Sequence, residues 1–388
     1  MSARVVVTGI GIMTPSGFGA ETVKHTILAG VHQFRPITRF DAAKFRSAVA
    51  AQSDFEGSLL DLGIRCTEDA IRSAGLSGSD AEEASLVLGI QGDYDALSQY
   101  WKLRREQELY DSRIAEFMPS CHLEALSHRF GLNGRGKKIV LNNACIASSN
   151  AIGIAYELIK QNRADRVLCG GYSLVTEEMY AKFDSGRAFA SDGRIRSFSR
   201  NRTGMLLGDG GAMLVLESYE SAKRRQAPIL AEMAGWGLSC DAFHVSQPHP
   251  EGAGVTRAVE KALRTSSIDK VGVHYINAHG TGTPYNDKSE TLGIKQAFGE
   301  HAYRIPISST KTMTGHILEG TGAVETAISI IAMNEGILPP TVGYEEPDPL
   351  CDLDYIPNQP RHQEVDTVLS INASFGGNNT AIIMRKLK

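Results

Sequence analysis

The chain lacks several features that would place it in a common class of protein. None of its apolar runs approaches the roughly 18 residues of a membrane-spanning helix. The opening segment Met1–Gly9 runs into a strand-like stretch without the charged and then apolar regions of a signal peptide. The net charge is only −4, from 40 Lys and Arg against 44 Asp and Glu. We therefore expect a soluble, cytoplasmic protein that binds neither nucleic acid nor membranes.

Paired cysteines are also missing. None of the six cysteines forms a C-x-x-C pair, which excludes the usual zinc spacings and fits reduced thiols better than a disulfide framework. We therefore expect no metal site, and chemistry from at most one or two of these thiols. The six are Cys66, Cys121, Cys145, Cys169, Cys240 and Cys351.

Short β-branched runs alternate with longer helical patterns, which predicts an α/β fold with buried strands. The predicted strands are Arg4–Val7, Ser85–Leu88, Lys138–Asn142, Arg166–Cys169, Ala212–Glu217, Val273–Asn277, Pro306–Ser309 and Val368–Asn372. The predicted helices are Glu21–Ala29, Leu60–Ala74, Ser149–Gln161, Gly254–Arg264, Asp287–Phe298 and Gly322–Asn334.

A weak internal repeat indicates two related halves. The segment Gly208–Glu217 resembles Phe375–Met384, since each is a glycine-rich turn followed by a β-rich strand. At 388 residues the chain also exceeds the roughly 250–300 residues at which one core stops growing. We predict an N-terminal half over residues 1–220 and a C-terminal half over residues 221–388, joined by a partly helical linker.

Cys145 is the candidate nucleophile. A strand leads into Asn143-Ala-Cys145, and small residues lead out of it into a helix. A helix N-terminus lowers the pKa of a thiol and favours the thiolate, and small neighbours let a substrate carbonyl approach. The alternative is that Cys145 is a small buried hydrophobe, the commoner fate of a cysteine.

Two histidines follow other predicted strands. His279 lies in the turn His279-Gly-Thr-Gly-Thr283, where Thr281 and Thr283 can bind a polar ligand. His316 lies five residues after Lys311, in a second turn between a strand and a helix. Lys311 has an alternative role as the partner of Glu325 in a buried ion pair.

A fourth turn, Asn372–Thr380, precedes the last strand, and its glycine pair lets backbone N–H groups approach a substrate. Phe375 in this turn either lines a pocket or packs in the core. A thiol candidate with two histidines and no metal motif indicates acyl transfer through a thioester.

These motifs make the chain resemble the β-ketoacyl-[acyl-carrier-protein] synthases, especially the elongating synthase II type of dissociated fatty-acid and polyketide systems. The resemblance covers nearly the whole chain and is closest at Asn277–Pro284, Ser308–His316, Gly208–Glu217 and Cys351–Asp354. It implies a thiolase-type fold of two related halves in α-β-α-β-α layers, and a dimer. It also implies a decarboxylative Claisen condensation with an acyl carrier protein as partner. No cofactor is implied, because the phosphopantetheine arm comes with the substrate.

The resemblance also implies residue roles. Cys145 would carry the acyl chain, while His279 and His316 would promote decarboxylation and stabilise the enolate. Lys311 would orient His316 and pair with Glu325, and the N–H groups of Cys145 and Phe375 would form the oxyanion hole. Phe375 would also gate the entrance. The remaining implied contacts are Thr281 and Thr283 with the phosphopantetheine arm, Phe183, Asp93 and Ile146 with the substrate, and Arg187 with the carrier protein.

Some positions depart from the family pattern. Asn143 stands where a threonine is usual, and Ile146 follows the cysteine where a smaller residue is common. Ser374 replaces the glycine before the gate, and Asp93 replaces an apolar residue of the acyl tunnel. These departures favour a specialised polyketide or polyene synthase over housekeeping elongation. The alternatives are a non-elongating partner subunit or a priming subunit of a ketosynthase heterodimer, and a thiolase, which would carry a second catalytic cysteine near the C-terminus.

Overall fold

The computed structural model describes residues 3–105, 112–132, 134 and 136–387. Its main sheet consists of two sets of strands with the same internal order. The N-terminal set runs β6-β5-β7-β8-β1, and the C-terminal set runs β11-β10-β14-β15-β9. In each set the first three strands are parallel and the next two pair antiparallel. The two sets therefore share one topology, as the internal repeat indicated.

The N-terminal set is built from strands that end near the predicted residues. Its strands are β1 (Val5–Thr14), β5 (Ser85–Gly89), β6 (Lys138–Leu141), β7 (Arg166–Ser173) and β8 (Gly210–Ser218). Its principal helices are α2 (Leu59–Ser73), α5 (Pro119–Arg129) and α6 (Ala147–Lys160). Ser58 caps α2 by accepting the N–H of Asp61, whose side chain accepts the N–H of Ser58 in return.

The C-terminal set repeats this plan. Its strands are β9 (Ala231–Cys240), β10 (Tyr275–Asn277), β11 (Ile307–Ser308), β14 (Thr367–Ala373) and β15 (Asn378–Arg385). Its principal helices are α9 (Ala253–Ser266), α10 (Pro284–Phe298) and α12 (Thr321–Glu335). Strands β1 and β9 pair where Val5 lies opposite Met233, which joins the two sets edge to edge.

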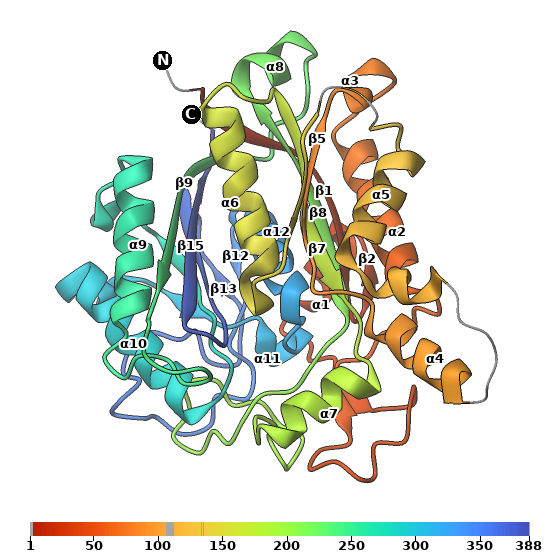
Figure 1. The fold of residues 1–388 in the computed structure, drawn as a ribbon. Helices are drawn as coiled ribbons and strands as arrows, with labels where there is room; N and C mark the ends of the chain where they lie inside the picture. Colours follow the sequence, from red (N-terminus) through yellow and green to blue (C-terminus); the bar gives the residue numbers. More distant parts are fainter. Residues whose placement is uncertain (1–2, 106–111, 133, 135, 388) are drawn as a thin grey trace.

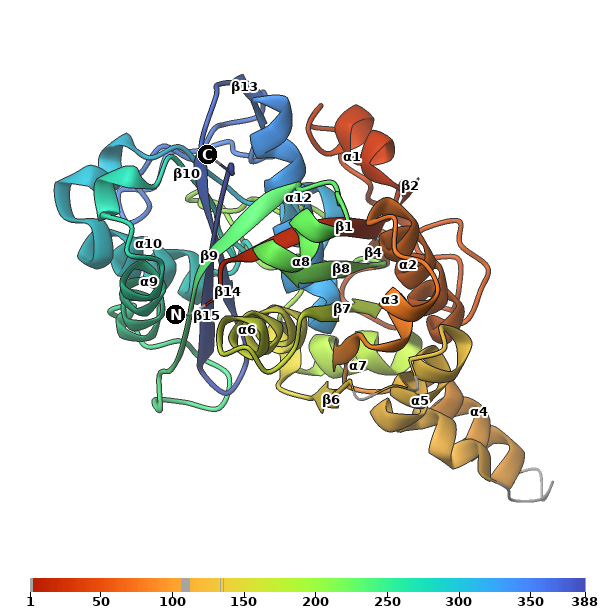
Figure 2. The same cartoon turned by 90° about the horizontal axis from the view of Figure 1, so that it is seen from above.

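The elements stack in five layers, α-β-α-β-α. Helices α2 and α5 cover the outer face of the N-terminal strands, and α9 and α10 lie outside the C-terminal strands (Figure 1). Helices α6 and α12 pack against each other and lie between the two sets of strands (Figure 2). Both central helices are apolar on nearly every side, as a helix between two sheets requires. The layered α/β arrangement predicted from the sequence is therefore confirmed.

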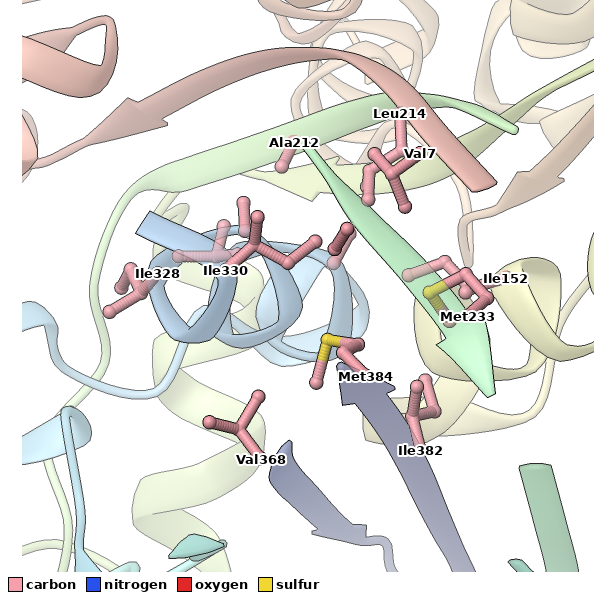
Figure 3. Close-up of a cluster of buried hydrophobic side chains, with 14 of the residues drawn as sticks. Val7, Ile152, Ala212, Leu214, Met233, Ile328, Ile330, Val368, Ile382 and Met384 are labelled. Atoms are coloured by element: carbon pink, nitrogen blue, oxygen red, sulfur yellow. The ribbon is translucent and has the colours of Figure 1, made fainter. Parts of the chain in front are cut away.

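The largest hydrophobic cluster fills the space around the central helices. It draws side chains from strands of both sets, such as Val7, Leu214 and Ile382, and packs them against Ile152 of α6 and Ile328 of α12 (Figure 3). The largest core of the protein is therefore formed jointly by the two halves.

The predicted strands and long helices all form, and most of their ends shift by a few residues, but β1 runs on to Thr14 where the prediction ended at Val7. Several elements had no predicted counterpart, among them α4 (Tyr94–Arg105) and α7 (Glu177–Ser185). The linker carries the short helix α8 (Tyr219–Arg224), in agreement with its partly helical character. The division at residue 220 stays a prediction. The short remaining elements are α1 (Ala20–Thr26), α3 (Ser79–Glu82), α11 (Lys311–Thr314), β2 (Gly17–Phe18), β3 (Arg35–Pro36), β4 (Val49–Ala50), β12 (Ile337–Leu338) and β13 (Arg361–His362).

Within the described residues, no helix is both long enough and apolar enough to cross a membrane.

Candidate active site

Most of the predicted site residues line one cavity of about 320 Å³. They come from the ends of strands in both sets and from α7, which lie far apart in the sequence. The predicted residues in its wall are Cys145, Phe183, Arg187, His279, Thr281, Thr283, His316 and Phe375. We call this space the Cys145 cavity.

Cys145 lies in a single 3-10 turn, η2 (Ala144–Ile146), that leads directly into α6. Ala144 before it has a φ of 56°, a left-handed conformation that is strained for a residue with a side chain. The thiol is 5% exposed and faces the cavity. The predicted placement at the start of a helix is thus confirmed, and the strained turn presents the sulfur to a ligand.

The predicted lowering of the Cys145 pKa is wrong. Burial, and after it the negative charge of Glu319, raise the pKa of this thiol to about 12. The positive charge of Lys311 opposes this rise but does not cancel it. Desolvation of a buried thiolate therefore outweighs the charge that favours it, and Cys145 is a neutral thiol at rest.

His279 lies just after β10, in a turn whose backbone is hydrogen-bonded to the side chain of Glu290. The two carboxylate oxygens of Glu290 accept the N–H groups of His279 (2.6 Å) and Gly280 (2.8 Å). Burial lowers the pKa of the His279 imidazole, and the charge of Lys311 lowers it again. The ring is therefore neutral at working pH. Its Nδ1 atom has no hydrogen-bond partner among the described residues.

The protonation of His316 is set by its surroundings. The backbone N–H of Leu318 donates to its Nδ1 at 2.9 Å, so that nitrogen carries no proton. Burial and Lys311 lower the pKa of this imidazole as well. A neutral ring with an unprotonated Nδ1 carries its proton on Nε2. The two imidazole rings lie 5.4 Å apart and nearly perpendicular, at 87°.

Lys311 does not line the cavity, although its charge acts on both histidines. Its Nζ atom lies 2.6 Å from Oε1 of Glu325, and both side chains are buried. The other oxygen of Glu325 accepts a hydrogen bond from Asn372 at 2.5 Å. The predicted pairing of Lys311 with Glu325 is confirmed as a contact, and it lies beneath the histidines.

Phe375 lies at the mouth of the cavity and is 47% exposed. Its ring stacks on Phe183 with centroids 5.6 Å apart. Gly376 and Gly377 after it have φ angles of 86° and 75°, which favour glycine. Arg187 lies exposed at the same mouth. The hydroxyls of Thr281 and Thr283 contact each other at 2.9 Å on the cavity wall.

Two predicted substrate contacts do not lie in the wall of the Cys145 cavity. Ile146 is fully buried. Asp93 lies in the wall of a neighbouring cavity, where its side chain accepts the N–H groups of Asp95 and Ala96. Among the residues that the structure describes, no group of three or more His, Cys, Asp or Glu side chains is arranged to hold a metal ion.

Two buried carboxylates near the site were not predicted. Glu290 orders the His279 turn, and Glu319 lies close enough to Cys145 to affect its pKa. The available signals were an acidic residue in a helix directly after the His279 turn, Glu290, and one among small and apolar residues, Glu319. Those signals do not distinguish a buried carboxylate from a solvent-exposed one.

Comparisons with known proteins agree with this geometry. The profile of the β-ketoacyl synthase N-terminal domain matches residues 57–222, and that of the C-terminal domain matches residues 230–345. A 3-oxoacyl-[acyl-carrier-protein] synthase 2 of Synechocystis sp. is 37% identical, over 99% of this chain and 98% of that protein. A putative polyketide beta-ketoacyl synthase 1 of Streptomyces halstedii is 35% identical, over 99% and 98%. The solved ishigamide ketosynthase/chain length factor superposes with a TM-score of 0.93 at 29% identity, covering 100% of both chains.

The chain belongs to the β-ketoacyl synthase family, and its layered architecture is the thiolase-type fold. It is an acyltransferase of the 3-oxoacyl-[acyl-carrier-protein] synthase type, with condensing activity in fatty-acid or type II polyketide synthesis.

The raised pKa of Cys145 predicts how the free enzyme reacts with iodoacetamide. Only the thiolate is alkylated, so the rate at Cys145 should rise about tenfold per pH unit through pH 10 without a plateau. Peptide mass spectrometry after timed labelling measures this rate. The same cysteine in the urea-unfolded chain is the control and should level off near pH 8.5–9, at about the ordinary pKa of a thiol. A plateau below pH 9 in the folded enzyme would contradict the assignment.

The Lys311–Glu325 pair predicts an asymmetric response to mutation. Lys311→Ala leaves the Glu325 carboxylate buried without a cation and should lower the free energy of unfolding by about 3–5 kcal/mol. The double variant Lys311→Met with Glu325→Gln should regain most of that stability, as measured by urea denaturation. Its acid limb of activity should move to higher pH, because Lys311 lowers the pKa of both histidines. If the acid side of the activity–pH profile did not move in the double variant, the Lys311–Glu325 pair would have a structural role only.

Proposed function

We propose that this enzyme joins an acyl chain held on Cys145 to a malonyl unit, with loss of CO₂, and releases a β-ketoacyl carrier protein. The observation that carries the proposal is the joint presence of Cys145, His279 and His316 in the wall of one cavity. Thr281 and Thr283 lie on that wall and present hydroxyls to a phosphopantetheine arm entering from the mouth. A non-elongating partner subunit would have no need of all three residues together.

The first half-reaction transfers the acyl chain to Cys145. The sulfur attacks the carbonyl of the acyl thioester, the carbon–sulfur bond to the carrier breaks, and the carrier thiol leaves with a proton. One thioester replaces another and one thiol replaces another, so the proton of the neutral Cys145 thiol ends on the carrier thiol. The N–H groups of Cys145 and Phe375 would receive the oxyanion. The N–H of Phe375 makes no hydrogen bond within the described residues, so it is available to a ligand.

The second half-reaction needs hydrogen-bond donors on the malonyl thioester oxygen. His316 has a donor at Nε2 because its Nδ1 accepts the N–H of Leu318. A fixed neutral donor stabilises the enolate that forms as the carbon–carbon bond to CO₂ breaks. The ring of His279, which lies beside that of His316 and nearly perpendicular to it, would donate a second hydrogen bond to the same oxygen. The enolate carbon then attacks the carbonyl carbon of the Cys145 thioester, the carbon–sulfur bond to Cys145 breaks, and the sulfur leaves as a thiolate that takes up a proton from solvent.

We further propose that the enzyme works in the cytoplasm in a specialised polyketide, polyene or fatty-acid pathway. We expect an acyl carrier protein to dock near Arg187 and a second ketosynthase-like chain to complete a homodimer or heterodimer. Solved relatives include a type II polyketide synthase carrier protein in complex with its ketosynthase, and a ketosynthase in complex with its chain length factor. The exposed Arg187 at the cavity mouth supports the docking position.

Cys145→Ala separates the two half-reactions. The variant should lose condensation, because no thioester forms, and should still decarboxylate malonyl carrier protein, because both histidines remain. Release of CO₂ and formation of β-ketoacyl product are measured on the same sample. Cys121→Ala, at a half-buried cysteine outside the cavity, is the matched control and should keep both activities. Undiminished condensation by Cys145→Ala would overturn the mechanism.

The specialised pathway predicts a departure from ordinary fatty-acid elongation. Carrier proteins loaded with saturated chains of graded length should show no preference for the long chains. Steady-state rates of condensation with each chain measure this preference. A rate that rises steadily with the length of a saturated chain would assign the enzyme to housekeeping elongation instead.

A further inference from the structure

A second cavity, of about 600 Å³, is lined in part by the same helix, α7, as the Cys145 cavity. We call it the acidic cavity, and it is lined in part by Asp93, Ser173, Thr176, Glu177 and Glu319. Helix α7 contributes to both spaces, with Glu177 and Met179 on the acidic cavity and Phe183 on the Cys145 cavity. The turn that carries Cys145 packs against the 3-10 turn η5 (Leu318–Gly320), which carries Glu319. Glu319 therefore stands between the nucleophile and the acidic cavity.

The Glu319 carboxyl is nearly enclosed, with only 2% of the residue exposed. Gln91 donates to it from Nε2 at 3.2 Å. No Lys, Arg or His of the described chain forms an ion pair with it within 4.0 Å. Burial raises its pKa to about 7, and more distant Lys182 lowers it only in part. A buried carboxyl without a cation is costly, and the one side-chain hydrogen bond to Glu319 among the described residues, from Gln91, is a neutral donor that does not balance its charge.

Asp93 gives the same cavity a second carboxyl without a cation. Burial raises the pKa of Asp93. The Nε2 atom of His122 lies 4.0 Å from its carboxylate. Burial lowers the pKa of His122 to about 4, and Tyr172 contacts its Nδ1 at 3.1 Å. His122 is therefore neutral and does not balance the charge of Asp93. The wall of the acidic cavity thus offers hydrogen-bonding groups beside apolar side chains such as Phe55, Leu174 and Met179.

We propose that Glu319 determines acyl specificity: the chain on Cys145 passes Glu319 into the acidic cavity, which favours hydroxylated acyl chains over saturated ones. This inference rests on the function proposed above. A saturated chain strips water from the carboxyl without replacing its hydrogen bonds. A hydroxyl replaces them whether Glu319 is ionised or protonated, because it both donates and accepts. A keto oxygen suits only the protonated carboxyl, and an ammonium group suits only the ionised one.

The test compares acylation of Cys145 by chains of equal length. Carrier proteins bearing octanoyl, 3-hydroxyoctanoyl, 5-hydroxyoctanoyl or 7-hydroxyoctanoyl groups are mixed with the enzyme, and intact mass spectrometry follows the acyl-enzyme. At least one hydroxylated chain should acylate the wild-type enzyme about tenfold faster than octanoyl. Glu319→Leu should reduce this ratio to about twofold or less. Glu319→Gln still accepts and donates hydrogen bonds, so this variant should keep most of the wild-type ratio.

Glu335→Gln is the control for the substitution itself, because Glu335 lines neither cavity and pairs with Lys24. Its ratio should equal that of the wild type. A ratio between two substrates on one variant does not change with the fraction of folded enzyme, so loss of stability alone cannot produce the effect.

Equal acylation by all four chains in the wild type would overturn this inference and leave the proposed condensation intact. An unchanged ratio in Glu319→Leu would do the same. Absence of acyl mass on Cys145 with every chain would overturn both proposals.

Discussion

The active site depends on the close contact between the first turns of the two central helices. The Oγ atom of Ser148 in α6 accepts the N–H of Ala323 in α12 at 3.0 Å. A Cβ on Gly322 would lie only 2.5 Å from the Cβ of Ser149, so this contact requires a glycine in α12. The Cys145 turn leads into α6 and the His316 turn leads into η5 and then α12. The distance between the starts of α6 and α12 therefore sets the spacing between Cys145 and His316. A larger residue in place of Gly322 or Ser149 would force the two helix starts apart.

Charge burial imposes the second constraint. Lys311, Glu325 and Asn372 form a buried network beneath the histidines and tie α11, α12 and β14 together. The positive charge of Lys311 acts on the site, because it lowers the pKa of both imidazoles. Neutral imidazoles then donate hydrogen bonds without bringing a positive charge into a desolvated cavity. The same desolvation keeps Cys145 protonated until a substrate enters, so one environment controls all three reactive groups.

Much of the fold and part of the site were predictable because they follow from local patterns. Short β-branched runs and long periodic segments predicted most strands of the two sets and five of the six principal helices, whereas β9 and α5 were not predicted. Turns rich in small residues marked where Cys145, His279 and His316 lie. Helices α4 and α7 escaped because they are short or have few buried residues, so their hydrophobic pattern is weak. The pKa of Cys145 was predicted in the wrong direction because the helix end is local, whereas the burial that outweighs it comes from the whole fold. The roles of Glu290 and Glu319 escaped for the same reason.

By itself the sequence determined the chemistry available to this protein: one thiol in a strand-to-helix turn, two histidines in glycine-rich turns, and two halves with one repeated plan. These are properties of neighbouring residues, and neighbouring residues set local conformation. Only the tertiary structure decided that the four turns meet in one cavity, that Lys311 pairs with Glu325 behind it, and that Asp93 and Glu319 share a second cavity. Those outcomes depend on which distant segments pack together. Packing also determines how much water each charged group loses, and no short segment of sequence specifies that loss.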